Sequence, residues 1–304
     1  PIDPEPYLFT EDEAADAPPI PTPPEHPNGD DRAFHRWRGS NVVPQKQEGF
    51  FAVFVKAPLG DIRAEEFFAL AEIAREFAGG RARTTLQQNL VFRWVREASL
   101  YPLWRRLAEI GLAEPDVHTI TDVTSCPGTD SCKLGITSSM GLAQALREVL
   151  SDDEIVDDPL IRSLHIKMSG CPNSCGQHHL ANIGFHGAAA RGVGNGHQVP
   201  SYEIFLAGAY AEGETRIGKR MRTRVPAKRA HEALRRMLTL YRESRNPGEK
   251  FNDFVDRVGT VPFEGLLKDI KVVDPPEGEA LDLYRDWGKE VLYKVERGEG
   301  ECSM

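Results

Sequence analysis

The sequence predicts an α+β protein in two parts, each of which mixes strands with helices. Its 304 residues suffice for one large domain or two modest ones with a substantial core. Apolar segments of strand and helix length follow one another twice, once before residue 118 and once after it. Two short cysteine-containing segments lie within the second succession. We expect four segments: a linker over 1–41, a first part over 42–117, a second part over 118–270 and a tail over 271–304.

The opening of the chain has the composition of a linker. Nine prolines fall within residues 1–27, interleaved with acids such as Glu11 and Asp12. Such a segment cannot bury enough apolar surface to offset the entropy that its ordering would cost. A recognition motif for proline-binding modules is the alternative interpretation. Residues 31–37 predict a short helix that leads into the fold.

The first part reads as strand, helix, strand, helix. Residues 50–57 are apolar, β-branched and aromatic, which is typical of a buried strand. Asp61 can cap a helix that runs to about Ala78, and Gly79 and Gly80 then end it. Residues 82–95 predict a second strand, and residues 100–110 predict a second helix.

The second part alternates loops, strands and helices around its cysteines. We predict helices over 133–150, from Cys175 through Ala181, and over 226–245, and strands over 164–168, 183–187 and 202–208. A helix that begins directly after Cys132 would point its N–H groups and its dipole toward the thiolates.

Four cysteines form the most informative pattern. Cys126 and Cys132 make a C-x5-C pair, and Cys171 and Cys175 make a C-x3-C pair about forty residues later. Thiolates are soft ligands, so four of them on two loops can hold an iron–sulfur cluster or a zinc ion. Structural zinc sites favour tighter knuckles, so the wide first loop favours a [4Fe–4S] cluster. A zinc site and unrelated thiols remain open as alternatives.

The residues around the cysteines carry a family resemblance. The segments CPGTDSCKLG and GCPNSCGQHH resemble the signature of nitrite and sulfite reductases that couple a sirohaem to a [4Fe–4S] cluster, and in particular the bacterial ferredoxin-linked branch. The resemblance runs from about Asn41 to Gly259. It implies a ferredoxin-like α/β repeat followed by a mixed α/β domain that binds the cluster and the sirohaem. RTTLQQNL resembles the second strand of that repeat.

The resemblance also implies roles for individual residues. All four cysteines would ligate the cluster, and Cys175 would also bridge it to the sirohaem iron as the catalytic residue. Asn173 matches a position whose loop lies against the tetrapyrrole, although a loop-shaping role is an equal alternative. The implied reaction is the six-electron reduction of sulfite to sulfide or of nitrite to ammonia, with electrons from reduced ferredoxin. A tail similar to those of sulfur-assimilation reductases favours sulfite slightly.

Sirohaem carries carboxylates, which arginine binds with bidentate geometry. Residues 216–236 contain nine Lys and Arg residues against one acid, Glu232. This basic stretch has three interpretations. It binds the carboxylates of the cofactor through residues such as Arg216, it docks an acidic ferredoxin, or it is an ordinary solvated face. Weaker cofactor-binding candidates in the first part are Gln88, Asn89 and Arg83, the last of which also reads as an exposed strand arginine.

Two histidines, His178 and His179, follow the second cysteine pair directly. On a helix they would face different directions, so they would not chelate one metal together. One of them is a candidate proton relay, because both reactions consume protons and imidazole titrates near neutrality. Packing against the fold is the favoured alternative.

The chain departs from the family in one respect. The family has two pseudo-repeated halves, whereas this sequence has a single strand–helix repeat before its cysteines. Together with the start at Pro1, this predicts a C-terminal half whose missing N-terminal half supplies most of the residues that grip the anion. Near the other end, Asp286-Trp287-Gly288 and Cys302 resemble sulfur-assimilation reductases. Cys302 reads either as a redox thiol on a mobile tail or as a thiol on a frayed terminus.

Composition excludes other classes of function. The net charge of −9 makes nucleic acid an unexpected partner. There is no run of eighteen apolar residues and no secretory h-region, so we expect neither a membrane span nor export and predict the cytoplasm. Five cysteines, four of them placed as ligands, indicate reduced thiols rather than disulfides.

Overall fold

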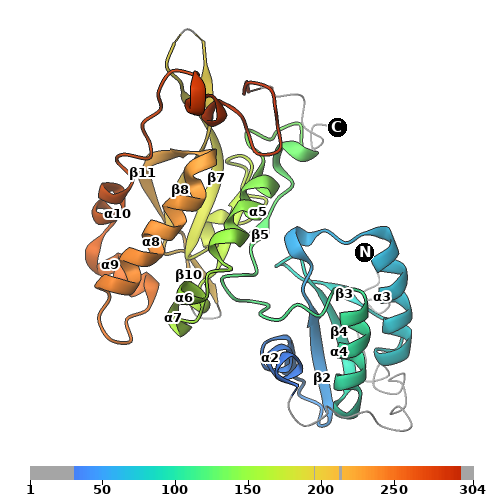
Figure 1. The fold of residues 1–304 in the computed structure, drawn as a ribbon. Helices are drawn as coiled ribbons and strands as arrows, with labels where there is room; N and C mark the ends of the chain where they lie inside the picture. The colour runs from blue at the N-terminus through green and yellow to red at the C-terminus, as the bar shows by residue number, and fades with distance from the viewer. Residues whose placement is uncertain (1–30, 195, 212–213, 296–304) are drawn as a thin grey trace, which may run out of the picture. The chain divides into compact units, whose positions relative to one another are not determined.

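The computed structural model describes residues 31–194, 196–211 and 214–295, and the chain divides into two compact units after His118 (Figure 1). The predicted linker falls largely on residues 1–30, outside the described part. None of the helices among the described residues is long and apolar enough to cross a membrane.

Over residues 31–118, the first unit consists of a four-stranded antiparallel sheet with three α-helices. Its elements are α2 (Arg32–Asn41), β1 (Val42–Pro44), β2 (Phe50–Val55), the 3₁₀ helix η2 (Pro58–Gly60), α3 (Ala64–Phe77), β3 (Arg83–Thr84), β4 (Leu90–Arg96), the 3₁₀ helix η3 (Glu97–Ser99) and α4 (Leu100–Glu109). The strand order is β1-β2-β4-β3. The predicted succession of strand, helix, strand and helix is therefore confirmed.

Two boundaries in this unit were predicted wrongly. The single strand expected over 82–95 is a hairpin, in which Thr84 of β3 pairs with Leu90 of β4. The turn between them is made possible by a left-handed backbone at Gln88, with φ of 66°. Arg63, not Asp61, is the N-cap of helix α3, because the side chain of Glu66 accepts the Arg63 N–H and closes the first turn at Ala64.

Helix α2 belongs to the core of the first unit. Asp31 caps it by accepting the Phe34 N–H at 3.2 Å. Phe34 and Trp37 are buried in the same hydrophobic cluster as side chains of β2, β4, α3 and α4. The predicted linker therefore cannot extend to residue 41, since α2 is part of the folded core of this unit.

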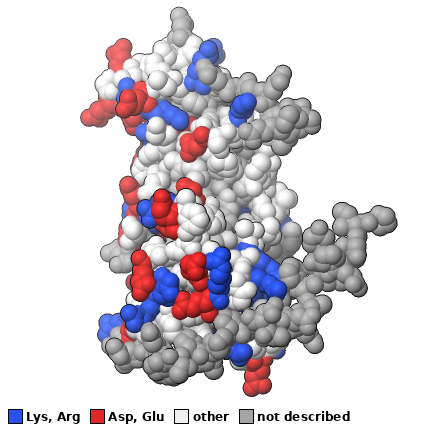
Figure 2. All heavy atoms as spheres, turned by 90° about the vertical axis from the view of Figure 1, so that its right-hand side faces the viewer, with Lys and Arg blue, Asp and Glu red and all other residues white. Residues whose placement is uncertain are grey.

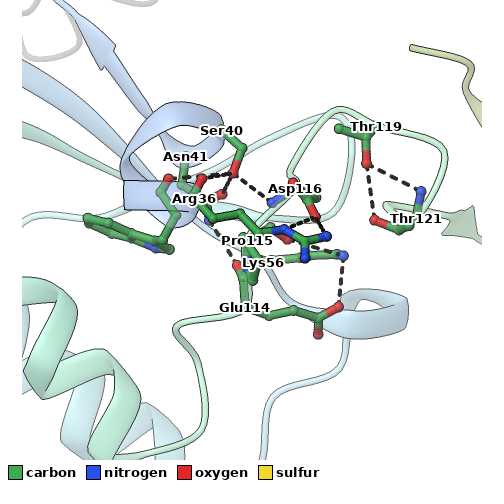
Figure 3. A network of polar contacts seen from close by, with 10 residues as sticks. Arg36, Ser40, Asn41, Lys56, Glu114, Pro115, Asp116, Thr119 and Thr121 are labelled. Carbon is green, nitrogen blue, oxygen red and sulfur yellow. Dashed lines mark hydrogen bonds and ion pairs between the residues drawn. The ribbon is translucent and has the colours of Figure 1, made fainter. Parts of the chain in front are cut away.

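Polar contacts tie α2 to the segment that follows α4 (Figure 3). The buried Asn41 side chain donates to the carbonyl oxygens of Phe54 and Glu114 at 3.1 and 3.0 Å. Arg36 binds Asp116 at 2.7 Å. Lys56 is 2% exposed, and its ammonium group binds the Glu114 carboxylate at 2.8 Å. These bonds satisfy charges and amides that the fold would otherwise bury without partners.

The second unit is built on a five-stranded sheet of order β11-β8-β7-β6-β5. Strands β5, β6 and β7 are parallel, whereas β8 and β11 are antiparallel to their neighbours. Helices α5 and α8 lie side by side over one face of this sheet (Figure 1). Its elements are β5 (Thr124–Ser125), η4 (Gly128–Asp130), α5 (Ser139–Val149), α6 (Asp153–Val156), α7 (Pro159–Arg162), β6 (Ile166–Ser169), η5 (His178–Leu180), β7 (Ile183–Arg191), β8 (Gln198–Leu206), β9 (Ala209–Ala211), β10 (Glu214–Arg216), β11 (Lys219–Pro226), η6 (Ala227–Arg229), α8 (Ala230–Ser244), α9 (Phe251–Val258), α10 (Val261–Leu266) and η7 (Gly278–Tyr284).

The two faces of this sheet differ in chemistry. Tyr202 of β8 lies on the face toward α5, because its hydroxyl donates to the Ser138 carbonyl at 2.8 Å. Neighbouring side chains along a strand alternate between faces, so Glu203 lies on the opposite face. Strand register places a polar row there, which consists of Ser169, His186, Glu203 and Arg224. The face toward the helices carries an apolar row, which includes Met168, Phe185 and Ile204.

Two helices expected next to the cysteines are shorter than predicted. Helix α5 begins at Ser139, not at residue 133, and Ser138 caps it by accepting the Gly141 N–H. The residues before it make loop contacts instead of helix. After Cys175 there is only the 3₁₀ helix η5, because left-handed backbone at Ser174 and Gln177, with φ of 63° and 59°, interrupts any longer helix.

The predicted tail is partly folded. Leu283, Tyr284 and Asp286 are buried, and Tyr284 packs against Val199 of β8. The expectation of a tail over 271–304 is therefore wrong for these residues. Cys302 lies outside the described residues.

We predict that Trp37→Ala lowers the free energy of unfolding of the first unit by about 3–5 kcal/mol, because a fully buried indole leaves a cavity. Phe68→Ala is the matched control, since Phe68 is 78% exposed and its removal should leave the free energy nearly unchanged. Urea unfolding of both variants measures the difference. Equal stabilities would show that α2 is not part of this core.

Candidate functional site

The two cysteine segments leave adjacent parallel strands at the same edge of the sheet. Ser125 of β5 pairs with Met168 of β6, and the Cys126 N–H continues the ladder by donating to the Met168 carbonyl at 3.2 Å. The carboxyl ends of parallel strands meet at one edge, so the loops after β5 and β6 start side by side. The Gly170 N–H then donates to Cys126 Sγ at 3.1 Å, which joins the second loop to a thiol of the first.

The loops touch where neither has a side chain. A Cβ on Gly170 would lie 2.5 Å from the Gly128 Cα, and a Cβ on Gly128 would lie 2.5 Å from Ser139 Oγ. Gly128 also has a left-handed backbone, with φ of +56°, which glycine adopts without strain. The Gly170 carbonyl accepts N–H groups from both Ile136 and Thr137, at 2.8 and 3.0 Å. Both loops are therefore fixed by backbone contacts.

All four thiols converge on one place. Partial burial raises the pKa of the Cys175 thiol, and the charges of Cys126, Cys171 and Cys132 raise it further. The four thiols therefore interact electrostatically at the edge where the two loops adjoin. Cys171 is buried, Cys126 and Cys132 are half-buried, and Cys175 is exposed. The group of thiols is therefore enclosed on one side and open at Cys175.

The surroundings fit an anionic group with several hydrogen-bond acceptors. In the described part of the chain, the buried polar atoms that lack a partner include Thr129 Oγ1 and His178 Nε2, on residues close in sequence to the cysteines. Thiolates and sulfides accept hydrogen bonds from such groups. No three His, Cys, Asp or Glu side chains of the described residues are arranged to hold a single ion. A four-iron cluster needs its thiolates further apart than a single ion does, and four cysteines on two adjoining loops are the candidate ligands for it.

The N-terminus of α5 reaches the first thiol although the helix starts later than predicted. Ser139, its first residue, has its Oγ 3.5 Å from Cys126 Sγ and donates to the Cys126 carbonyl at 2.6 Å. The positive end of the helix dipole therefore lies close to Cys126, where it favours the thiolate.

The two histidines support the second loop. Their rings lie 4.0 Å apart between centroids, so the prediction that they face different directions is wrong. His178 Nδ1 is 3.0 Å from Ser169 Oγ, and His179 Nδ1 is 3.0 Å from Ser174 Oγ. Burial lowers the pKa of His178 to about 3, with smaller contributions from His179 and His186, so His178 is neutral near pH 7. Both imidazoles thereby contact serines that flank the cysteines.

Much of the basic stretch over 216–236 is neutralised inside the unit. Glu203, which is 3% exposed, binds Arg220 and Arg224 at 2.6 Å each and lies 3.3 Å from His186 Nε2. Asp256 binds Arg216 and Lys219 at 2.7 and 2.6 Å. Acidic and basic side chains lie next to one another over the face drawn in Figure 2 as well. These acids are distant in sequence, so the stretch alone could not reveal them.

The remaining predicted residues occupy different environments. Asn173 is exposed in the second cysteine loop. Gln88, Asn89 and Arg83 belong to the β3–β4 hairpin of the first unit. Asn89 is buried, and its Oδ1 accepts the Ala57 N–H at 2.9 Å, so this side chain fixes its own loop. Arg216 likewise donates to the Ala207 carbonyl in addition to Asp256.

Sequence reasoning missed a contact between the end of the described chain and the first cysteine loop. We call residues 283–295 the strap. Asp286 accepts the Ser138 N–H at 2.7 Å, and the Tyr293 hydroxyl donates to the Ile136 carbonyl at 2.7 Å. The Asp-Trp-Gly motif within the strap was visible in the sequence, but nothing there indicated its target.

A cavity of about 430 Å³ lies between the strap and the first cysteine loop. Cys132 and Asp286 both line it, together with three lysines, Lys133, Lys289 and Lys294. A second hollow of about 380 Å³ lies around His165, Tyr210 and Asn252, and no cysteine lines it. Only the first of these two cavities adjoins the thiols.

Comparison with known families matches both parts of the chain. Residues 43–110 match the family model described as the nitrite/sulfite reductase ferredoxin-like half domain. Residues 117–272 match the one described as the nitrite and sulphite reductase 4Fe-4S domain, which alone covers about half of the chain.

Curated relatives agree with these matches. A ferredoxin–nitrite reductase of Synechococcus elongatus is 29% identical over 65% of this chain and 37% of its own length. The chloroplastic ferredoxin–nitrite reductase of Zea mays is 32% identical over 65% of this chain and 34% of its own. A sulfite reductase [NADPH] hemoprotein beta-component of Geobacillus thermodenitrificans is 30% identical over 69% and 35%. The chain thus spans about a third of the length of these relatives.

Solved structures show the same fold. The NirA protein of Mycobacterium tuberculosis superposes with a TM-score of 0.63 at 26% identity, over 74% of this chain and 41% of that one. A dissimilatory sulfite reductase I superposes with a TM-score of 0.54 at 12% identity, over 80% and 76%, which is a likeness of fold alone.

We predict that Gly170→Ala lowers the free energy of unfolding of the second unit by about 1–3 kcal/mol or more, because the new methyl group overlaps backbone atoms that cannot move aside. Gly265→Ala in α10 is the matched control, since nothing lies within 4 Å of its Cβ position. Denaturant unfolding of the metal-free chain compares the two. The close contact of the loops would be disproved if Gly170→Ala were as stable as the control.

Proposed function

Because the chain belongs to the nitrite and sulfite reductase family, we propose that it is the part of such a reductase that holds a [4Fe–4S] cluster beside a sirohaem. The complete enzyme would reduce sulfite to sulfide or nitrite to ammonia with six electrons. The observation that carries this proposal is that the two cysteine loops leave adjacent parallel strands and meet at one edge of the sheet, where the Gly170 N–H donates to Cys126 Sγ.

Cys126, Cys132, Cys171 and Cys175 would hold the cluster. The cluster and the sirohaem together supply one-electron transfer and a site where the anion is reduced. The protein contributes a fixed frame, since the loop backbones are joined at Gly170 and cannot adjust freely. It also contributes donors: the Gly170 N–H and the N-terminus of α5 stabilise the negative charge on Cys126.

Cys175 is the proposed contact with the sirohaem. It is the exposed member of the four cysteines, so its sulfur is accessible to a second group. The neighbouring Asn173 is exposed too and is the cofactor-binding candidate that the second loop supports best. Arg83, Gln88, Asn89 and Arg216 remain predictions, and the internal bonds of Asn89 and Arg216 favour a structural role for those two.

The relatives leave more than one substrate and more than one electron donor open for the complete enzyme. Their names include ferredoxin-linked nitrite reductases and an NADPH-linked sulfite reductase. We propose reduced ferredoxin as the donor and either anion as the substrate. Since the chain spans about a third of these relatives, we also propose that an N-terminal half completes the anion pocket.

Two alternative functions would give a different cofactor content. An electron-transfer module without sirohaem would contain the cluster alone. A structural zinc domain would be colourless and redox-silent, and all four cysteines would then act through folding alone.

An anaerobic absorption spectrum with iron, zinc and sulfide analysis of the full-length protein tests the proposal. We expect sirohaem bands and about five irons per chain, four from the cluster and one from the sirohaem. Four irons without a tetrapyrrole would leave an electron-transfer module, and zinc without iron would overturn the proposal altogether. Kinetics with sulfite and with nitrite then identify the preferred anion.

We predict that Cys126→Ser and Cys175→Ser differ in their effects. Cys126→Ser should reduce the iron content through loss of the cluster, whereas Cys175→Ser should also abolish the spectral coupling between the two cofactors. Cys302→Ser, outside the four ligands, is the control, and its turnover and iron content should match those of the wild type. Identical, purely structural losses at Cys126 and Cys175 would refute the special role of Cys175.

A further inference from the structure

A buried acid of the strap lies at the start of α5. Asp286 is 3% exposed, and one of its carboxylate oxygens accepts the Ser138 N–H at 2.7 Å. The other oxygen accepts the N–H of Trp287 at 2.9 Å. Ser138 is the residue that caps α5, so Asp286 places an acidic group at the positive end of this helix, where a negative charge is favoured.

The residues around Asp286 belong to the first cysteine loop or adjoin it. Ser138 is followed by Ser139, whose Oγ lies 3.5 Å from Cys126 Sγ. Asp286 and Cys132 line one cavity. The hydroxyl of Tyr202 donates to the Ser138 carbonyl, and burial, Asp286 and Cys126 all raise the pKa of this tyrosine. Asp286 and the cysteines therefore act on the same few residues.

The strap holds Asp286 in this position. The Trp287 side chain lies against Gly141 of α5, where an added Cβ would be only 2.2 Å from the Trp287 Cβ. The indole N–H donates to the Ala227 carbonyl at 3.0 Å, and the Tyr293 hydroxyl fixes the strap to Ile136. With anchors on both sides, the carboxylate cannot turn away from Ser138.

The charges that act on Asp286 partly offset one another. Burial is the largest cause and raises the pKa of Asp286 above its ordinary value, and Asp130 raises it further, while the N–H groups of Ser138 and Trp287 and the charge of Lys228 oppose this rise. Lys228 also lies over the Trp287 ring, 4.5 Å from its centroid. Two N–H bonds to one carboxyl group favour its charged form.

We propose that Asp286 is a positioning residue that lowers the reduction potential of the cluster in this chain. It acts in two ways: it fixes the first cysteine loop through Ser138, and it offsets the helix dipole that would otherwise favour the added electron. A nearby buried negative charge makes uptake of an electron less favourable, because the cluster becomes more negative when it is reduced. This inference rests on the proposed function, since it requires a cluster on the four cysteines.

Redox titration of the full-length holoenzyme, followed by electron paramagnetic resonance, tests the role of Asp286. Asp286→Asn keeps the size of the side chain and one oxygen acceptor but removes the charge. We expect its cluster to titrate at a more positive potential than the wild type, with unchanged iron content. Asp274→Asn makes the same change of charge on an exposed side chain and should leave the potential unaltered.

The outcomes separate the two proposals. A wild type without a cluster refutes the proposed function itself. A cluster whose potential is the same in Asp286→Asn and Asp274→Asn overturns only the role of Asp286. If Asp286→Asn does not fold, Lys228→Gln provides the second test, because it leaves the carboxylate less compensated and should shift the potential downward. No downward shift would then overturn the inference.

Discussion

The site depends on the contact between two backbones at Gly170. Parallel pairing of β5 with β6 brings the two cysteine loops to one edge, and the absence of side chains at Gly128 and Gly170 lets them touch. One carbonyl, that of Gly170, then accepts two N–H groups from the first loop, while its own N–H reaches Cys126 Sγ. The thiols are thus placed by main-chain geometry, which is stiffer than any arrangement of side chains on mobile loops.

The sheet of the second unit has one polar and one apolar face, which explains why the two cysteine loops lead into different kinds of helix. The first loop leads into α5 on the apolar face, whereas the second leads into η5, which packs on the polar face. A Cβ at Gly184 of β7 would lie 1.9 Å from the His178 carbonyl, so η5 sits directly on that strand. Charges buried near it are costly unless they are paired. Lys167 illustrates this: burial lowers its pKa, and its ammonium group binds Gln177 Oε1 at 3.0 Å and lies over the ring of Tyr210.

The fold class and the regular strands could be predicted from sequence because apolar periodicity reports them locally. Strand β2 and helix α4 are close to their predicted bounds for this reason. The predictions were wrong where left-handed backbone or contacts distant in sequence determine the element bounds. These places are the β3–β4 turn at Gln88, the late start of α5 and the break after Cys175. Spacing could select the cysteines, but it could not show that Glu203 and Asp256 neutralise the basic stretch or that the strap reaches Ser138. Such contacts join residues that are far apart in the sequence.

Because main-chain contacts hold the loops, only the surrounding side chains can change the electrostatics of such a site. Hydrogen bonds from the Ile136 and Thr137 N–H groups to the Gly170 carbonyl are retained by any sequence that keeps the loop conformation, and the bond from the Gly170 N–H requires only Cys126 in addition. Variation in electrostatics must therefore come from side chains around the loops, such as Ser139, His178 and Asp286. Of these three, only Asp286 can contribute a charge near pH 7, since Ser139 does not ionise there and His178 is held neutral by burial. Its position at the N-terminus of α5 opposes the dipole that stabilises the thiolate, so the same residue that orders the loop also limits how readily the site accepts negative charge.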